Sequence, residues 1–509
     1  MSTEVDMKDV ELNEVEQEKQ PMTAGDAGNG DASSPTSTEK NGAVKVKMAD
    51  ETETKFTGLS KDELLKVAGT PAWVRTRWAL LILFWLGWFG MLAGAIGIII
   101  QAPRCKPLPE MNWWNQGALY EIGDVQAFSE NLDGLKQKID ALAQLKVKGL
   151  LVGPIHKSTN DVNELDLNTV SVAGSLTQFE ALLDAAHKKS INVVLDLTPN
   201  YLGEQPWFDD MMTVANKLKV ALVHWQKLKV DGFKFSGIER VIAVQPAVWE
   251  ELRAQVQNGT DEKKGVLIGV TEKSSPEEVG ALLNSSGVDL LLSGVLRASG
   301  RSGIQVAGAA EQLLGAQNQT KLAWNVGERK QGHLASLVGG ELVKLNQMLL
   351  LTMPGTPVFN YGDEIGLEDQ VANKFPQMIW DKPEDAETLN GTAKEELDER
   401  VALRSYFKSL SELRSKERSL LHGDFVALHS SNSSLAYLRS WDQSQRYVAA
   451  FNWGPDAVTL SLAHDQLPAQ ATVEVSTDPE QLAPKSPVDL KALVLGANQA
   501  VLLQFPYTG

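Results

Sequence analysis

Cys105 is the only cysteine in a chain of 509 residues, and its thiol is the most distinctive reactive group in the sequence. A single cysteine excludes an internal disulfide bond and any zinc or iron–sulfur site that needs several cysteines. The seven histidines are scattered and form no HExxH-type pair, so we expect no metal site, and no cofactor site is predicted. The thiol of Cys105 therefore either stays free or forms a disulfide bond with another chain.

The element that positions Cys105 is an apolar run that ends five residues before it. Residues Trp78–Ile100 form 23 consecutive positions without a charge. As a helix this run spans about 35 Å, which is enough to cross a bilayer. A buried core helix is the alternative, but soluble helices of this length rarely lack a polar face. Because some 77 residues precede the run, it is not a cleaved signal peptide. We therefore predict one transmembrane signal-anchor helix over residues 78–100.

The charges that flank the apolar run predict its orientation. Basic residues are more numerous before it (Lys61, Lys66, Arg75 and Arg77) than after it (Arg104 and Lys106). The positive-inside rule then places the N-terminus in the cytosol and the remaining 400 or so residues outside, as in a single-pass type II protein. Cys105 would lie in an oxidising compartment beside the bilayer, where a membrane-bound partner is held at high effective concentration. This favours an intermolecular disulfide bond over a free thiol.

Four glycines in the apolar run, Gly87, Gly90, Gly94 and Gly97, share one face of the predicted helix. Gly90 and Gly94 form a GxxxG pair. Small residues aligned in this way let another helix approach the backbone closely, which favours association in lipid. The alternative is that glycine is simply frequent in membrane helices. We interpret the face as a packing surface for the membrane helices of a partner.

The remaining polar features fit this topology. Residues 1–77 are predicted to be a cytosolic tail, and residues 1–60 of it are rich in charged and small polar residues that cannot bury a core, so we expect disorder there. A net charge of −17 argues against nucleic acid as the main partner.

The tail has no N-x-S/T glycosylation sequon, whereas the predicted outer segment has five. The predicted glycosylation sites are Asn258, Asn284, Asn318, Asn390 and Asn432.

The outer segment alternates short β-rich runs with helical patterns after a neck at residues 101–116. Eight strands alternating with helices over about 250 residues predict a (β/α)8 barrel, placed at residues 117–419. Alternating strand-like runs and turn residues then predict an antiparallel β-sandwich at residues 420–509. The eight predicted barrel strands are Ala118–Ile122, Gly149–Val152, Asn192–Leu197, Gly232–Phe235, Val266–Val270, Val288–Leu292, Lys321–Trp324 and Pro357–Tyr361. Long helices are expected over Leu132–Leu145 and Leu334–Leu351.

The order of these blocks resembles the α-amylase family of glycoside hydrolases. The similar blocks are GALYEIGDVQAF, VKGLLVGPIH, VVLDLTPNY, VDGFKFSG, VLIGVT, LAWNVG and MPGTPVFNYGDEIGL. The resemblance covers roughly residues 117–509 and implies a TIM barrel of the α-amylase type. Such hydrolases need two carboxylates that flank the scissile bond.

The residues that match the family's catalytic positions are not carboxylates. They are Ser236, Val270 and Gly327. Glu272 lies two residues beyond Val270, so a shifted alignment would place one acid on the same strand, but one acid without a nucleophile makes no hydrolase. The lobe that active members insert after the third strand is also absent, since about 30 residues join Tyr201 to Gly232. We therefore predict a pseudoenzyme.

An amylase-like ectodomain on a type II anchor with an adjacent cysteine is similar to the heavy chains of heteromeric amino-acid transporters. The missing lobe points to the cell-surface antigen heavy chain among these, as do the blocks KFTGLSKDELLKVAGTPAWVRTRWALL and SKERSLLHGDF. The resemblance implies a disulfide bond from Cys105 to a multispanning light chain, which the heavy chain stabilises and carries to the plasma membrane, on the basolateral side in epithelia. It also implies a link to integrin β subunits. The alternatives are an adhesion or signalling glycoprotein and a membrane-anchored glycoside hydrolase.

Overall fold

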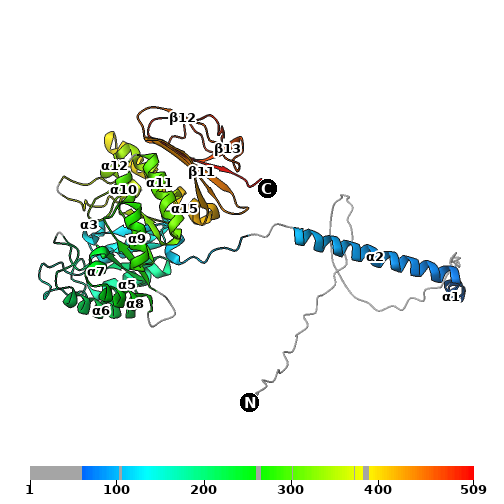
Figure 1. Cartoon of the computed structure of the whole chain (residues 1–509), viewed down its shortest axis with the longest axis horizontal. Coiled ribbons are helices and arrows are strands. Elements are labelled where there is room, and N and C mark those ends of the chain that lie inside the picture. The colour runs from blue at the N-terminus through cyan, green and yellow to red at the C-terminus, as the bar shows by residue number, and fades with distance from the viewer. Residues whose placement is uncertain are drawn as a thin grey trace, which may run out of the picture. The chain divides into compact units, whose positions relative to one another are not determined.

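The structure is a computed structural model, and it describes residues 60–101, 106–203, 205–258, 265–300, 302–371, 373–381 and 389–508. It forms two compact units, residues Met1–Ala102 and Pro103–Gly509, which we describe separately (Figure 1). Cys105 and the segment 1–59, for which we expect disorder, lie outside the described residues.

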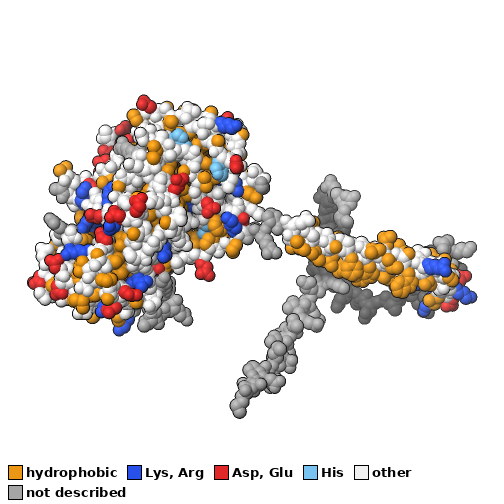
Figure 2. All heavy atoms as spheres, in the orientation of Figure 1, with side chains coloured by type: hydrophobic (Ala, Val, Ile, Leu, Met, Phe, Trp, Pro, Cys, Tyr) orange, Lys and Arg blue, Asp and Glu red, His pale blue; other side chains and the backbone are white. Residues whose placement is uncertain are grey.

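The described residues of the first unit form two helices, α1 (Lys61–Ala68) and α2 (Pro71–Gln101). α1 begins with a capping box, in which the Ser60 hydroxyl accepts from the backbone N–H of Glu63 and the Glu63 carboxylate accepts from the backbone N–H of Ser60. α2 has 31 residues and a mean hydropathy of 2.1 in its most apolar window. Its length of about 46 Å and its apolar surface, seen in Figure 2, make it long and apolar enough to cross a membrane.

The second unit is built around a closed barrel of eight parallel strands that pair in chain order. The barrel prediction is therefore confirmed. The strands are β1 (Leu119–Ile122), β2 (Gly149–Val152), β3 (Asn192–Asp196), β4 (Gly232–Ser236), β5 (Val266–Val270), β6 (Leu290–Leu292), β7 (Leu322–Trp324) and β8 (Thr356–Asn360). Two of them, β2 and β5, coincide with the predicted ranges.

Helices surround the barrel (Figure 1). They are α3 (Val125–Ser129), α4 (Leu132–Gln144), α5 (Leu176–Lys188), α6 (Met211–Lys227), α7 (Ile238–Val244), α8 (Pro246–Gln257), α9 (Pro276–Ser286), α10 (Val295–Ser299), α11 (Gly303–Ala316), α12 (Leu334–Val338), α13 (Val343–Thr352), α15 (Thr392–Lys416) and α16 (Arg418–Leu421). The short 3-10 turns are η1 (Trp113–Asn115), η2 (Gln319–Lys321), η3 (Gly340–Leu342) and η4 (Asp363–Ile365). Between β3 and β4, α6 is the one helix formed by the described residues.

The single helix expected over Leu334–Leu351 is wrong, because the segment is divided into α12, η3 and α13. The break lies at Gly339, whose φ of 91° is incompatible with a right-handed helix. Leucines at helical spacing on both sides of the break bury against the same core, so the hydrophobic pattern continues where the helix does not.

The barrel interior changes from apolar to charged along the strands. Side chains two residues apart in a strand point to the same face. In β1, Leu119 belongs to the apolar cluster inside the barrel, and Glu121 follows it one layer higher. In β3, Val194 and Asp196 repeat this arrangement. Lys234 of β4 contacts both carboxylates. The alternation of side chains along these strands therefore places a layer of charged residues near their carboxyl ends.

The chain ends in antiparallel sheets that pack against the barrel. A six-stranded sheet has the order β14-β13-β16-β11-β10-β9, and β12 pairs with β15. The strands are β9 (Asp424–Ser430), β10 (Ser434–Ser440), β11 (Arg446–Asn452), β12 (Val458–Leu460), β13 (Gln470–Ser476), β14 (Pro487–Asp489), β15 (Leu493–Leu495) and β16 (Gln499–Phe505). One face of the large sheet shares the barrel core, and the other forms a second core with the small sheet.

Two fully buried arginines bind backbone carbonyls, and one of them, Arg439, joins the large sheet to the barrel. Arg414 of α15 donates to the carbonyl oxygens of Leu351 and Met353 at 2.7 and 2.9 Å, and also to that of Gly355. Arg439 of β10 donates to three further carbonyls. Burial lowers the pKa of Arg414 to about 9 and that of Arg439 to about 10. Both guanidinium groups still titrate above neutral pH, so each binds its carbonyls in the charged form.

Candidate functional site

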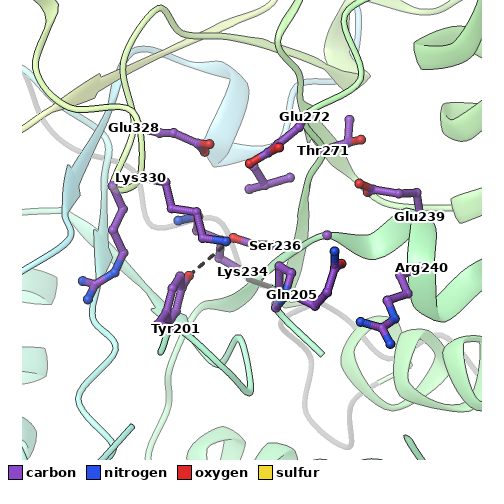
Figure 3. A pocket seen from close by; sticks show the side chains of 14 residues that line it. Tyr201, Gln205, Lys234, Ser236, Glu239, Arg240, Thr271, Glu272, Glu328 and Lys330 are labelled. Carbon is purple, nitrogen blue, oxygen red and sulfur yellow. Dashed lines mark hydrogen bonds between the residues drawn. The ribbon is translucent and has the colours of Figure 1, made fainter. Parts of the chain in front are cut away.

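A cavity of about 200 Å³ lies at the carboxyl ends of the barrel strands, which is the end where TIM barrels carry their sites. We call it the barrel pocket. It is formed by the ends of β4 and β5 and by the loops that follow β3 and β7 (Figure 3). Its lining includes Tyr201, Lys234, Ser236, Val270, Glu272 and Glu328.

A buried ion cluster forms the floor of the barrel pocket. The ammonium of Lys234 lies 2.5 Å from Oε1 of Glu121 and 3.0 Å from Oδ2 of Asp196. The hydroxyl of Tyr201 donates to Asp196, whose other oxygen accepts from the backbone N–H of Thr198 at 3.0 Å. Lys234 is only 1% exposed. One cation thus neutralises part of two carboxylate charges that are closed off from water.

The electrostatics of the cluster keep Lys234 and Asp196 charged. Burial acts to lower the pKa of Lys234, but the carboxylates of Asp196 and Glu121 outweigh it and raise that pKa well above the usual value. Burial acts to raise the pKa of Asp196, but Lys234 and the hydrogen bonds from Tyr201 and Thr198 leave it below the usual value. The cluster is therefore a closed salt bridge, and neither Lys234 nor Asp196 is poised to exchange a proton near neutral pH.

The residues at the expected catalytic positions lie around the barrel pocket. Ser236 and Val270 are the last residues of β4 and β5 and both line the cavity, whereas Gly327 is buried in the loop after β7, next to the lining residue Glu328. The Ser236 hydroxyl lies 3.4 Å from the Tyr201 hydroxyl. Glu272 is exposed and lines the pocket, as a shifted alignment allows.

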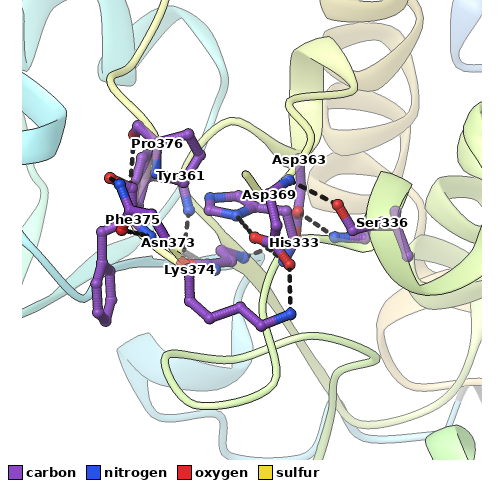
Figure 4. Close-up of polar contacts among 11 residues, drawn as sticks. His333, Ser336, Tyr361, Asp363, Asp369, Asn373, Lys374, Phe375 and Pro376 are labelled. Carbon is purple, nitrogen blue, oxygen red and sulfur yellow. Dashed lines mark hydrogen bonds and ion pairs between the residues drawn. The ribbon is translucent and has the colours of Figure 1, made fainter. Parts of the chain in front are cut away.

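A second polar cluster fixes the loops that follow β7 and β8 (Figure 4). Nδ1 of the buried His333 lies 2.7 Å from Asp369, which also pairs with Lys374 at 3.0 Å. Both oxygens of Asp363 accept backbone N–H groups, from Leu334 at 2.9 Å and from Asn360 at 2.8 Å. Burial raises the pKa of Asp363 to about 8. These residues hold loop backbone in place and do not face the barrel pocket.

Sequence reasoning missed the partners of this site. The sequence motifs single out neither Glu121 nor Glu328, and they include Lys234 only as part of the VDGFKFSG block. A signal was present for Glu121 and Lys234, since each is a charged residue inside an otherwise buried strand. Within the described residues, no group of three or more His, Cys, Asp or Glu side chains is arranged to hold a metal ion.

Both parts of the chain match known protein families. The family described as "Solute carrier family 3 member 2 N-terminus" matches residues 43–120, and "Alpha amylase, catalytic domain" matches residues 117–264. The amino acid transporter heavy chain SLC3A2 of Oryctolagus cuniculus is 44% identical over 531 residues, which cover 99% of each chain. That of Mus musculus is 44% identical with the same coverage.

The chain belongs to the SLC3A2 family of amino acid transporter heavy chains. This heavy chain is less similar to the amino acid transporter heavy chain SLC3A1 of Rattus norvegicus, with 22% identity over 92% of this chain and 89% of the relative. The subfamily inferred from the missing lobe is thus confirmed.

Solved structures confirm the fold of the heavy chain's second unit. An inactive double mutant of MutB in complex with isomaltulose aligns with a TM-score of 0.63 at 14% identity, over 78% of this chain and all of that one. The α-amylase of Geobacillus thermoleovorans, in complex with acarbose, aligns with a TM-score of 0.61 at 18% identity, over 79% and 100%. The barrel is therefore of the α-amylase type.

The structure places the heavy chain's other predicted sites on its surface. The asparagines of all five sequons are exposed: Asn258, Asn284, Asn318, Asn390 and Asn432. A Cβ atom added to any of the four glycines of α2 would meet no atom within 4 Å: Gly87, Gly90, Gly94 and Gly97. Both sets are thus accessible, the first to a glycan and the second to another helix. Cys105, which belongs to the predicted neck, lies outside the described residues.

Proposed function

We propose that this heavy chain is a non-catalytic type II membrane glycoprotein that binds a multispanning amino-acid transporter light chain through Cys105 and the α2 helix. It stabilises the light chain and brings it to the plasma membrane, where the light chain exchanges amino acids. The observation that carries this proposal is the 44% identity to SLC3A2 heavy chains over 99% of both chains, because that match includes the anchor, the neck and the ectodomain.

The membrane unit supports the proposed contact. α2 presents Gly87, Gly90, Gly94 and Gly97 on one face, where the backbone is open to close approach by a partner helix. Cys105 follows the end of α2 by four residues, so its thiol would lie near the bilayer surface. Helix packing would bring the two chains together, and the disulfide bond would then hold them.

The barrel pocket supports the absence of glycosidase chemistry. A retaining hydrolase needs a nucleophile and an acid about 5–5.5 Å apart at the carboxyl ends of the strands. The ends of β4 and β5 offer the hydroxyl of Ser236 and the isopropyl group of Val270 instead. The inward carboxylates Glu121 and Asp196 are bound to Lys234. We expect no turnover of α-glucosides; turnover by wild type that disappears in Glu272→Gln would favour the membrane-anchored hydrolase instead.

Removal of the heavy chain from a cell line is expected to abolish most light-chain expression at the surface and most amino-acid exchange. The reason is that an unpartnered light chain would expose the helix face that α2 covers. The measurement is surface labelling together with uptake of radioactive amino acids, in knockout cells and after re-expression. Re-expressed Glu272→Gln serves as the control and should restore uptake fully. Unchanged uptake in the knockout would defeat the proposal and favour adhesion or signalling, for example with integrins.

A further inference from the structure

The barrel pocket contains a carboxylate that has no hydrogen-bond or ion-pair partner among the described residues. Glu328 follows β7, is 7% exposed, and points into the cavity (Figure 3). Within the described residues, its side chain forms no hydrogen bond and no ion pair. A buried carboxylate in this state is costly, because it loses its hydration without a compensating contact. Burial accordingly raises the pKa of Glu328 to about 7.

Two more carboxylates line the same cavity. Glu272 and Glu239 lie on the same side of the pocket as Glu328 in Figure 3. Oε2 of Glu239 is buried and has no hydrogen-bond partner among the described residues. Glu272 is exposed and forms no ion pair with any described residue. Three carboxylates thus face one cavity, and at least two of them have oxygen atoms that accept no hydrogen bond from the described part of the chain.

Two of the four cations that line the pocket are held in ion pairs. Lys234 is bound to the two carboxylates of the barrel floor. Arg240 forms an ion pair with Asp209 at 2.5 Å. The guanidinium of Arg329 lies over the ring of Tyr201, 4.6 Å from its centroid. Among the described lining residues, Arg329 and the exposed Lys330 form no ion pair, so three carboxylates without an ion pair, Glu239, Glu272 and Glu328, stand against two such cations.

We propose that the barrel pocket binds a small aliphatic amine, with one ammonium group between Glu272 and Glu328 and, in a diamine, a second group toward Glu239. The cavity of about 200 Å³ has room for a four-carbon diamine, since an engineered cavity of about 150 Å³ holds benzene. An ammonium group supplies three donors and a positive charge, which is what these carboxylates lack. This ligand class is distinct from the sugars in the structural neighbours, and the proposal goes beyond the transporter role, because it needs no light chain.

Binding of an amine should weaken as the pH falls through about 7. The ammonium group favours the ionised form of Glu328, and protonation of that carboxylate removes the attraction. The charged groups that act on Glu328 are Lys234, Glu121, Arg297 and Glu272, and of these Lys234 and Arg297 favour its ionised form whereas the two glutamates oppose it.

The test is isothermal titration of the full-length chain in detergent with putrescine, and with 1,4-butanediol as the neutral ligand of equal length. We expect saturable heat with putrescine, none with butanediol, and a loss of affinity of about tenfold or more in Glu328→Gln. Glu480→Gln, an exposed glutamate far along the chain in the sheet region, is the matched control and should bind as wild type does.

Three results would overturn the proposal. They are the absence of saturable heat at millimolar putrescine, equal binding by Glu328→Gln, and equal binding of butanediol. The melting temperature of Glu328→Gln should not fall, because the substitution removes an unpaired buried charge. If that variant fails to fold, Glu272→Gln, at an exposed position, provides the same comparison. Light-chain binding plays no part in the titration, so its failure would leave the proposed function untouched.

Discussion

Replacement of Lys234 by methionine is expected to lower the free energy of unfolding of the barrel by about 3 to 5 kcal/mol. The ammonium of Lys234 is the cation that contacts both Glu121 and Asp196, and all three side chains are nearly inaccessible to solvent. Methionine preserves the volume but leaves two carboxylates buried without a counter-charge. The measurement is denaturant unfolding of the full-length chain in detergent, followed by tryptophan fluorescence.

Lys330→Met is the matched control for Lys234→Met. Lys330 is exposed at the opening of the same pocket and has no ion pair among the described residues, so its loss should change the unfolding free energy by less than about 0.5 kcal/mol. The triple variant Lys234→Met, Glu121→Gln, Asp196→Asn should recover most of the lost stability, since no unpaired charge remains. If Lys234→Met alone is as stable as wild type, the cluster does not stabilise the barrel.

The pH dependence of this effect follows from the two pKa shifts. The lowered pKa of Asp196 means that its contribution is present above the usual aspartate pKa and is lost as the pH falls through the lowered value. The raised pKa of Lys234 means that its contribution is present below the usual lysine pKa and is lost as the pH rises through the raised value. The difference between wild type and Lys234→Met should therefore be largest near neutral pH and should narrow in acid.

Arg439→Met is expected to cost about 3 kcal/mol and to loosen the sheet from the barrel. The Arg439 guanidinium donates to the carbonyl oxygen of Thr352 at 2.5 Å, of Leu420 at 3.1 Å and of Gly423 at 3.0 Å. Methionine would leave these carbonyls buried without donors, at the junction of α13, α16 and β9. Hydrogen exchange should show faster exchange in β10 and α16 than in the barrel strands.

Arg418→Met is the control, because Arg418 lies on α16 in the same region but is exposed. It should change stability by less than about 0.5 kcal/mol. Arg439→Lys should recover only part of the loss, since an ammonium lacks the planar fork that reaches carbonyls on two sides. Unchanged exchange in β10 of Arg439→Met would mean that apolar packing alone holds the sheet.

The local pattern of apolar and turn residues was enough to predict the barrel, as β2 and β5 show. Gly149–Val152 and Val266–Val270 are short apolar runs bounded by turn residues, and a buried parallel strand has that composition. The segment that breaks at Gly339 shows what a local pattern cannot predict. Its leucines keep helical spacing, but the positive φ depends on how the loop must turn to reach β8.

The ion cluster could be predicted only in part. Alternation along β1 and β3 places Glu121 and Asp196 on the inner face, yet their shared partner Lys234 is 113 and 38 residues away in the chain. No local pattern encodes that pairing, because strand tilt and barrel closure set it. Glu328 was missed for another reason. The residue that matches the family's catalytic position is Gly327, one place before Glu328, so the motif does not single out Glu328.

A non-reducing gel of detergent-solubilised membranes, with wild type and Cys105→Ser side by side, tests the central claim most directly. We expect a larger species in wild type that collapses on reduction and is absent from Cys105→Ser, and mass spectrometry of that band should identify a multispanning transporter. The glycosylated monomer should be present in equal amount in both samples after reduction. If wild type runs only at the monomer mass without reductant, the covalent heavy chain–light chain link is contradicted.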